Sequence, residues 1–197
     1  MNMECSSKAV FKKEFFRKLL HLPALFFLLL GNFYLKTSVV LLLLLLLIYS
    51  AEYLMRRIFQ KETPFLTDLI TRLRRSPQFD FGPFFLALSL ILLLLFLPMI
   101  SALCGTLLIV VSDAAAAWAG LSFGTHKIFY SQKKSYVGSF TFFVSAFLCL
   151  IFLIGFYPAL ALSLFGCLLE SLPVGQLDNL LVPLGVALFH CLLFYQA

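Results

Sequence analysis

Long apolar segments, separated by short polar or basic stretches, fill most of this chain and restrict what it can fold into. A transmembrane helix needs roughly 20 predominantly apolar residues, and fewer where other protein surrounds it. Hydrophobic residues make up 62% of the 197 positions and charged residues only 12%, whereas soluble domains average about 25% charged residues. No soluble fold of this size could bury so much apolar surface, so the sequence predicts a membrane protein.

The segments predict an all-α fold, a polytopic bundle of about seven transmembrane helices in a single membrane domain that covers residues 1–197. The predicted spans are residues 19–34, 38–55, 82–98, 99–119, 137–156, 158–172 and 180–196. The first is expected to be a retained helix, because no small-x-small cleavage site follows it. Pro183 predicts a break or kink in the last span. Six or eight spans remain possible if the short sixth segment is re-entrant.

Lysine and arginine occur almost entirely in one alternate set of loops. Of the 15 such residues, only Lys36 falls in the other set. The positive-inside rule therefore predicts that the N-terminus and the loops after spans two, four and six are cytoplasmic. We expect an integral protein of a bacterial inner membrane or an organelle membrane. The net charge of +6 is a topology signal in this reading, so no nucleic-acid partner is expected.

An acidic residue interrupts the fourth apolar segment. Asp113 follows Ser112 in an otherwise apolar run, and intramembrane acids are costly and usually functional. Ala117, Gly120 and Gly124 follow at intervals of three and four residues, so they share one helical face with the acid. Such a face of small residues lets a second helix or a ligand approach closely. We expect Asp113 to be functional.

Two basic segments could hold phosphate. Arg17 and His21 are four residues apart before the first span, with Lys18 beside them, and they could also move a proton. A snorkelling basic flank is the alternative.

The second basic segment contains Lys127 and Lys134, followed by Ser135 and Gly138 before the fifth span. A lysine, a hydroxyl and a glycine at a helix start could cradle phosphate through backbone N–H groups. The P-loop pattern G-x-x-x-x-G-K-[ST] is absent, so this is not a P-loop.

A third polar group lies between the last two spans, where Glu170 is followed by Asp178 and Asn179. Asp178 or Asn179 could simply cap the last helix. Together with Asp113, however, these acids would supply oxygen ligands for Mg²⁺, which usually takes one or two carboxylates plus substrate phosphates. A cytoplasm-facing site with cations for phosphate and acids for a metal indicates phosphoryl or nucleotidyl transfer on a lipid.

These motifs resemble the dolichol kinase and phytol kinase family of polytopic, CTP-dependent lipid kinases. The resemblance covers most of the chain and rests on five motifs in the same order. They are Arg17-Lys18-x-x-His21, Gly82-Pro83, Ser112-Asp113-x-x-Ala-x-x-x-Gly-x-x-x-Gly-x-His-Lys, Lys134-Ser135-x-x-Gly138-Ser139, and Glu170-Ser171 followed by Asp178-Asn179-x-x-x-Pro183.

The resemblance implies CTP as phosphoryl donor and a membrane lipid alcohol, a prenol, polyprenol or diacylglycerol, as acceptor. It implies that Asp113 and Asp178 bind or position Mg²⁺, supported by Glu170 and Asn179. One acid or His21 would take the proton from the alcohol. The residues implied in nucleotide binding are Arg17, Lys18, Gly120, Gly124, Lys127, Lys134, Ser135 and Gly138.

Two other functions remain open. The central stretch is also similar to phosphatidate cytidylyltransferase, although Val137 stands where both families tend to have glutamate. A small ion or solute transporter is the third hypothesis, because intramembrane acids often mark ion pathways. The identity of the lipid and the oligomeric state cannot be read from these motifs.

Overall fold

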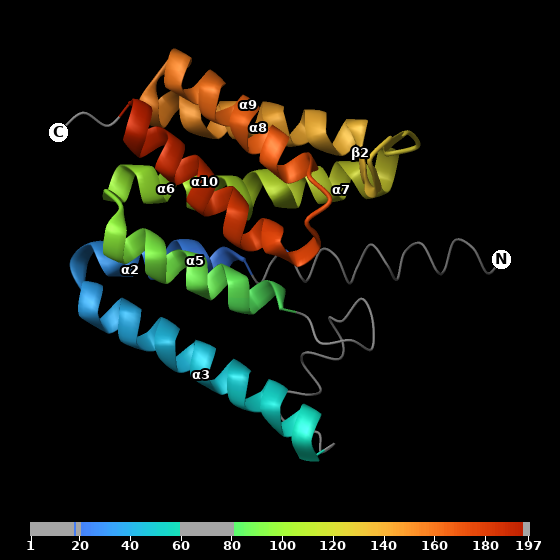
Figure 1. Cartoon of the computed structure of the whole chain (residues 1–197). Helices are drawn as coiled ribbons and strands as arrows, with labels where there is room; N and C mark the ends of the chain where they lie inside the picture. The colour runs from blue at the N-terminus through green and yellow to red at the C-terminus, as the bar shows by residue number, and fades with distance from the viewer. Residues whose placement is uncertain (1–17, 19–20, 60–80, 195–197) are drawn as a thin grey trace.

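The computed structural model describes residues 18, 21–59 and 81–194, with the side chains of residues 55–59 and 132–133 left aside. Within these residues the chain forms seven apolar helical segments that lie side by side (Figure 1). They are α2 (Leu22–Phe33), α3 (Leu35–Phe59), α5 (Gly82–Phe96), α6 (Met99–Leu107) continuing into α7 (Asp113–Phe123), α8 (Tyr136–Ile154), α9 (Phe156–Ser171) and α10 (Asp178–Leu193). The all-α prediction is confirmed.

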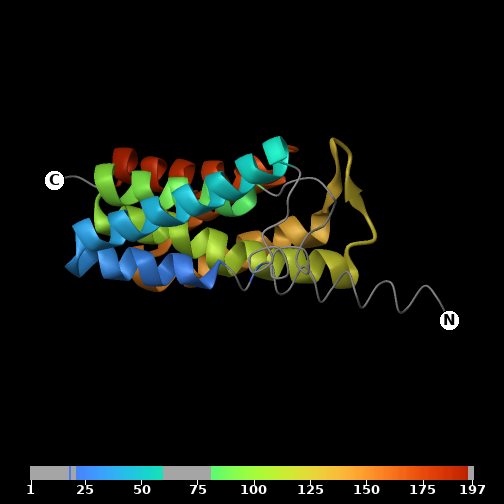
Figure 2. The same cartoon turned by 90° about the horizontal axis from the view of Figure 1, so that it is seen from below.

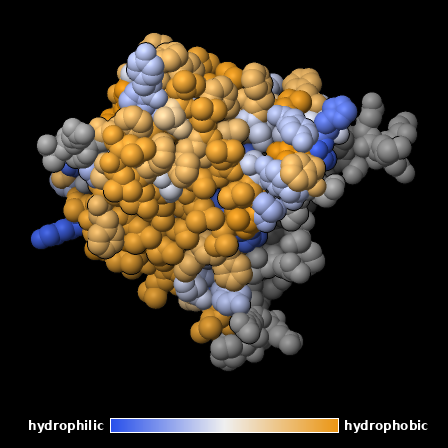
Figure 3. Space-filling view, turned by 45° about the horizontal axis from the view of Figure 1, so that its top comes forward, coloured by the Kyte–Doolittle hydropathy of each residue, from blue (hydrophilic) through white to orange (hydrophobic). Residues whose placement is uncertain are grey.

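Four of the segments are long and apolar enough to cross a membrane by length and composition. They are Leu35–Leu54, Met99–Phe123, Tyr136–Ile154 and Gly175–Leu193. The other three, α2, α5 and α9, are shorter, with 12, 15 and 16 residues. Apolar side chains cover most of the face shown in Figure 3, while polar side chains gather at its ends. The chain is therefore a helical membrane protein, with fewer full-length spans in the described residues than the seven predicted.

The core lies where α10 packs between α5, α6 and α9, and where α8 packs on α7 and α9. Leu28, Leu93, Phe142 and Leu162 are fully buried there. Small residues permit close backbone contact: a Cβ added to Gly105 would lie 2.9 Å from the carbonyl carbon of Pro183. In contrast, α3 packs on α2 and α5 at the edge of the bundle, where most of its leucines are exposed.

Of the break or kink predicted at Pro183, the break is wrong, because α10 runs through this residue from Asp178 to Leu193. Pro183 is the sixth residue of the helix, so it removes one intrahelical hydrogen bond, and the helix continues on both sides of it. The irregular backbone instead precedes α10, where a short 3₁₀ turn spans Gly175–Leu177 and Gly175 has a φ of 68°.

The basic segment after α7 folds into a β-hairpin, which the sequence analysis did not predict. Strand β1 (Lys127–Ile128) pairs antiparallel with β2 (Ser131–Ser135), and α8 follows directly. The hairpin projects from the same end of the bundle as the end of α9 and the start of α10 (Figures 1 and 2). This arrangement brings segments far apart in the sequence to one end of the molecule.

Candidate active site

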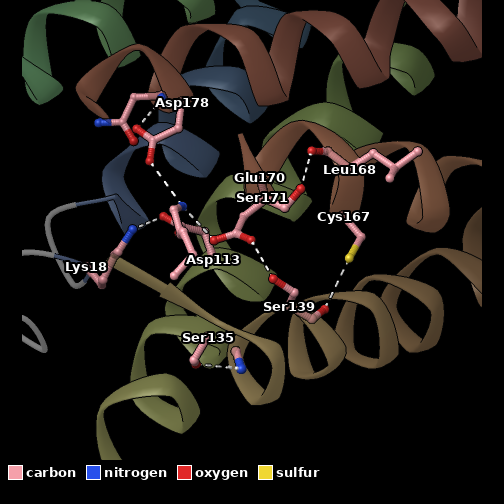
Figure 4. A network of polar contacts seen from close by, with 12 residues as sticks. Lys18, Asp113, Ser135, Ser139, Cys167, Leu168, Glu170, Ser171 and Asp178 are labelled. Atoms are coloured by element: carbon pink, nitrogen blue, oxygen red, sulfur yellow. Dashed lines mark hydrogen bonds and ion pairs between the residues drawn. The ribbon is translucent and has the colours of Figure 1, made fainter. Parts of the chain in front are cut away.

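Polar side chains from five segments meet inside the hairpin end of the bundle (Figure 4). They come from the residues before α2, the start of α7, strand β2, the end of α9 and the start of α10. These segments were predicted to carry the site, and the structure brings them together. The polar residues form two lysine–carboxylate clusters.

The first cluster is the ion pair between Lys18 and Asp113. The side chains are 7% and 6% exposed, so both charges are largely shielded from water. A charge buried in a membrane bundle persists only when it is paired. Lys18, expected to hold nucleotide, thus lies against the acid of the fourth apolar segment, and the pair ties the start of α2 to α7.

The second cluster is built around Lys134. Its Nζ donates to Glu170 Oε1 at 2.6 Å and lies 3.6 Å from Asp178 Oδ2. Ser139 Oγ donates to the other carboxylate oxygen of Glu170 at 3.3 Å. One ammonium group therefore contacts acids from two helices, and β2 is joined to both α9 and α10.

His21 and Asn179 connect the two clusters. His21 Nε2 lies 3.4 Å from Asn179 Oδ1, and both side chains are buried. Asn179 follows Asp178 of the second cluster, and its backbone N–H donates to Asp178 Oδ1 at 2.9 Å. The backbone N–H of His21 donates to the carbonyl of Lys18, in the first cluster, at 3.0 Å. A continuous polar path thus runs from Lys134 to Asp113.

The small residues of α7 receive the start of α8. A Cβ added to Gly120 would lie 3.1 Å from Ser135 Oγ, and one added to Gly138 would lie 3.6 Å from the Cα of Gly120. Ser135 is buried and caps α8, because its Oγ accepts from the backbone N–H of Gly138 at 3.1 Å. Gly124 also packs on Ser135. Helix packing, one of the two expected uses of this face, is therefore what the structure contains.

Two further cations were predicted to contribute to the site. Lys127 is exposed on β1, and Arg17 lies outside the described residues. Among the described residues the three acids contact different lysines: Asp113 pairs with Lys18, while Glu170 and Asp178 share Lys134. Within the described residues, no group of three or more His, Cys, Asp or Glu is placed to hold a metal ion. Two carboxylates, Glu170 and Asp178, lie close enough to share a single cation.

Sequence reasoning missed two features. Leu108–Ser112 forms a π-helical segment directly before Asp113, and π-bulges frequently occur at functional sites. Ser112 Oγ is buried there and has no hydrogen-bond partner among the described residues. Nothing in an apolar run of this kind distinguishes π from α geometry.

The second missed feature is Tyr130, in the turn of the hairpin. Its hydroxyl donates to Ser171 Oγ at 2.9 Å, and Ser171 Oγ donates to the carbonyl of Leu168 at 2.8 Å. The hairpin is therefore joined to the end of α9 by Tyr130 as well as by Lys134. A hydroxyl pairing across 41 residues leaves no local signal in the sequence.

Comparison with known proteins finds distant similarity to a lipid kinase. The chain is 31% identical to phytol kinase 1, chloroplastic, of Arabidopsis thaliana, over 66% of this chain and 49% of that protein. It is also 31% identical to an uncharacterised protein of Rickettsia prowazekii, over 54% of this chain and 55% of that protein. The chain thus spans about half the length of these relatives. No protein-family model and no solved structure matches it.

Proposed function

We propose that this protein is a kinase of the prenol type, which transfers a phosphoryl group from CTP to the hydroxyl of a membrane lipid alcohol. The observation that carries the proposal is the pair of linked lysine–carboxylate clusters at one end of an apolar bundle. At that position a lipid hydroxyl in the bilayer can meet a water-soluble phosphoryl donor. The distant similarity to a phytol kinase supports the same reaction class.

The chemistry of phosphoryl transfer matches the charges present. Its main catalytic need is positioning and neutralisation of the transferring phosphoryl group. Lys134 is the cation best placed for this role, because its side chain is 21% exposed and so within reach of a soluble ligand. Exposed Lys127 would add a second contact to the phosphates. The motif implied that Gly120 and Gly124 make room for the nucleotide. In the present proposal they act indirectly, because they set the position of Ser135 and the hairpin.

The hard oxygen donors of Glu170 and Asp178 suit a divalent cation such as Mg²⁺. Such an ion would supply charge neutralisation to the phosphates when bound. We propose these two residues as the ligands of the ion. We assign Asp113 to the lipid alcohol, the acceptor of the phosphoryl group. Asp113 and His21 lie on the α2 side of the polar path, where either could receive the proton of the alcohol.

The proposed topology follows from the same geometry. All seven helical segments would cross the membrane, the shorter ones partly surrounded by protein. The hairpin end would face the cytoplasm, because Lys127, Lys133 and Lys134 lie in this segment. The lipid tail would then reach the site from the bilayer, while CTP arrives from the cytosol.

The proposal is tested with the full chain purified in detergent and supplied with γ-labelled CTP or ATP. The acceptors are farnesol, phytol, a long polyprenol and diacylglycerol. We expect label in the lipid, release of CDP, and a preference for CTP. If a phosphorylated lipid is supplied instead, release of labelled pyrophosphate from CTP together with a CDP-lipid would make the protein a cytidylyltransferase. Failure to label any acceptor, with protein that remains monodisperse, would overturn the kinase proposal.

A further inference from the structure

We propose that Lys134 acts as the counter-cation of Glu170 and Asp178 until a divalent metal ion binds these carboxylates and displaces it. The displaced lysine is then available to bind phosphate. This inference rests on the proposed function, because it takes the same two carboxylates as the metal ligands. It adds an exchange of partners: the lysine leaves the acids when the metal ion arrives. Binding of metal and of phosphate would then be coupled through one side chain.

The contacts of Lys134 carry the first step. Its Nζ lies 2.6 Å from Glu170 Oε1 and 3.6 Å from Asp178 Oδ2. These acids belong to different helices, so the ammonium occupies the position from which one cation contacts both. A metal ion contacting the same oxygens would meet strong repulsion from the ammonium. The site therefore accommodates one cation at a time.

The charges give the second step. Two carboxylates face one ammonium, which leaves an excess of one negative charge when all three are ionised. Ser139 adds a hydroxyl donor to Glu170 but no charge. Replacing the ammonium by a divalent ion would neutralise both carboxylates and release one positive charge. The cluster therefore favours a doubly charged cation over the lysine it holds.

Exposure gives the third step. The Lys134 and Asp178 side chains are 21% and 19% exposed, whereas Lys18 and Asp113 are 7% and 6% exposed. Glu170, in contrast, is 6% exposed, so it needs a cation beside it at all times. A divalent ion would supply that cation as the partly solvated ammonium leaves. Lys134 also sits on a hairpin outside the helices, which a hydroxyl pair between Tyr130 and Ser171 joins to α9. The lysine can thus change partners without disturbing the bundle.

Thermodynamic linkage makes the exchange measurable, since a ligand that frees a group for a second ligand raises the affinity of both. The test uses Mn²⁺ alone as the probe, with its binding to the full chain followed by electron paramagnetic resonance in the absence of nucleotide. Lys134→Met removes the competing charge, so we expect Mn²⁺ to bind about fivefold more tightly or better. Lys134→Arg should weaken Mn²⁺ binding, because a guanidinium holds two carboxylates more firmly.

Lys127→Met is the matched control. It removes the same charge from the same hairpin, but from an exposed position where solvent screens it, so the Mn²⁺ affinity should stay within about a factor of two. Adding Glu170→Gln to Lys134→Met should abolish the gain.

Equal or weaker Mn²⁺ binding by Lys134→Met, absence of Mn²⁺ binding by both proteins, or a gain that survives Glu170→Gln would each overturn the proposal. If Lys134→Met does not fold, Lys134→Arg decides: weaker Mn²⁺ binding supports the exchange and unchanged binding rejects it. The readout does not depend on catalysis. Tighter Mn²⁺ binding without lipid phosphorylation would reject only the kinase function, and phosphorylation without tighter binding would reject only the exchange.

Discussion

The two lysine–carboxylate clusters differ in their access to water. Among the described residues Lys18 pairs with Asp113, and both side chains are almost completely buried. Lys134 is shared by two acids; its side chain and that of Asp178 are partly exposed, whereas that of Glu170 is 6% exposed. Breaking the fully buried pair leaves an uncompensated charge, whereas Lys134 and Asp178 remain partly solvated when they separate. The Lys18–Asp113 pair on the α2 side therefore holds its position, whereas Lys134 on the hairpin side can exchange partners.

The largest expected effect comes from Asp113→Asn, which removes the charge from the buried pair. If Asp113 acts in proton transfer, kcat/KM for lipid phosphorylation should fall by about 10²–10⁴-fold. The measurement is phosphorylation of the best acceptor by γ-labelled CTP. A variant with more than a tenth of the wild-type kcat/KM would remove Asp113 from the catalytic step.

Lys18→Met tests the other half of the buried pair through stability. Asp113 would remain buried without its partner, so the free energy of unfolding should fall by about 3–5 kcal/mol. Adding Asp113→Leu should restore much of this loss, because the uncompensated charge disappears, but should not restore activity. Unfolding by denaturant in mixed micelles provides the measurement. A single variant as stable as the double variant would show that the pair is not held as tightly as its burial indicates.

Lys134→Met should lower the free energy of unfolding by about 1–3 kcal/mol, because buried Glu170 loses its cation. The loss should be smaller than for Lys18→Met, because Lys134 and Asp178 are partly exposed. Added salt should weaken the Lys134 contacts more than the Lys18 pair, since solvent ions screen exposed charges more strongly. Unfolding of wild type and both lysine variants at low and high ionic strength separates the clusters. If Lys134→Met lost several kcal/mol of unfolding free energy independently of salt, the Lys134 cluster would be as well shielded from solvent as the Lys18 pair.

Tyr130→Phe should have the smallest effect. It removes one hydroxyl from a partly exposed hydrogen bond with Ser171, which contributes about 0.5–1.5 kcal/mol. We expect faster amide hydrogen exchange in β1 and β2, with exchange in α9 unchanged. Ser101→Ala is the control, because Ser101 pairs with His190 in the interior, on helices α6 and α10. Equal exchange in the hairpins of Tyr130→Phe and wild type would show that Lys134 and the strand pairing hold the hairpin alone.

Much of the fold could be predicted because hydropathy reports burial in lipid directly. Each predicted span contains a helix, and α5 begins at the predicted Gly82. The predicted break at Pro183 failed because the packing of α10 on α5, α6 and α9 outweighs the one hydrogen bond that a proline removes. The hairpin was missed because two short strands with basic residues have no apolar alternation to reveal them.

The site was predictable at the level of residue type and position but not of pairing. An acid in an apolar run must find a partner, so Asp113 was expected to matter. That its partner is Lys18, 95 positions away, depends on how α2 packs beside the rest of the bundle. The same holds for Glu170 and Lys134, which meet only after β2 folds back toward the end of α9. Long-range pairing is a property of packing, which a single sequence does not encode locally.

The π-helical turn at Leu108–Ser112 lets the two halves of one long helix, α6 and α7, contact different neighbours. A residue inserted into an α-helix rotates everything beyond it by about 100°. Before the turn, α6 faces α2 and α10, and after it α7 faces α8. Deleting one residue within the turn would preserve the apolar length but return the two halves to one angular phase. Asp113 would then point away from its present direction while every apolar residue remained in the membrane.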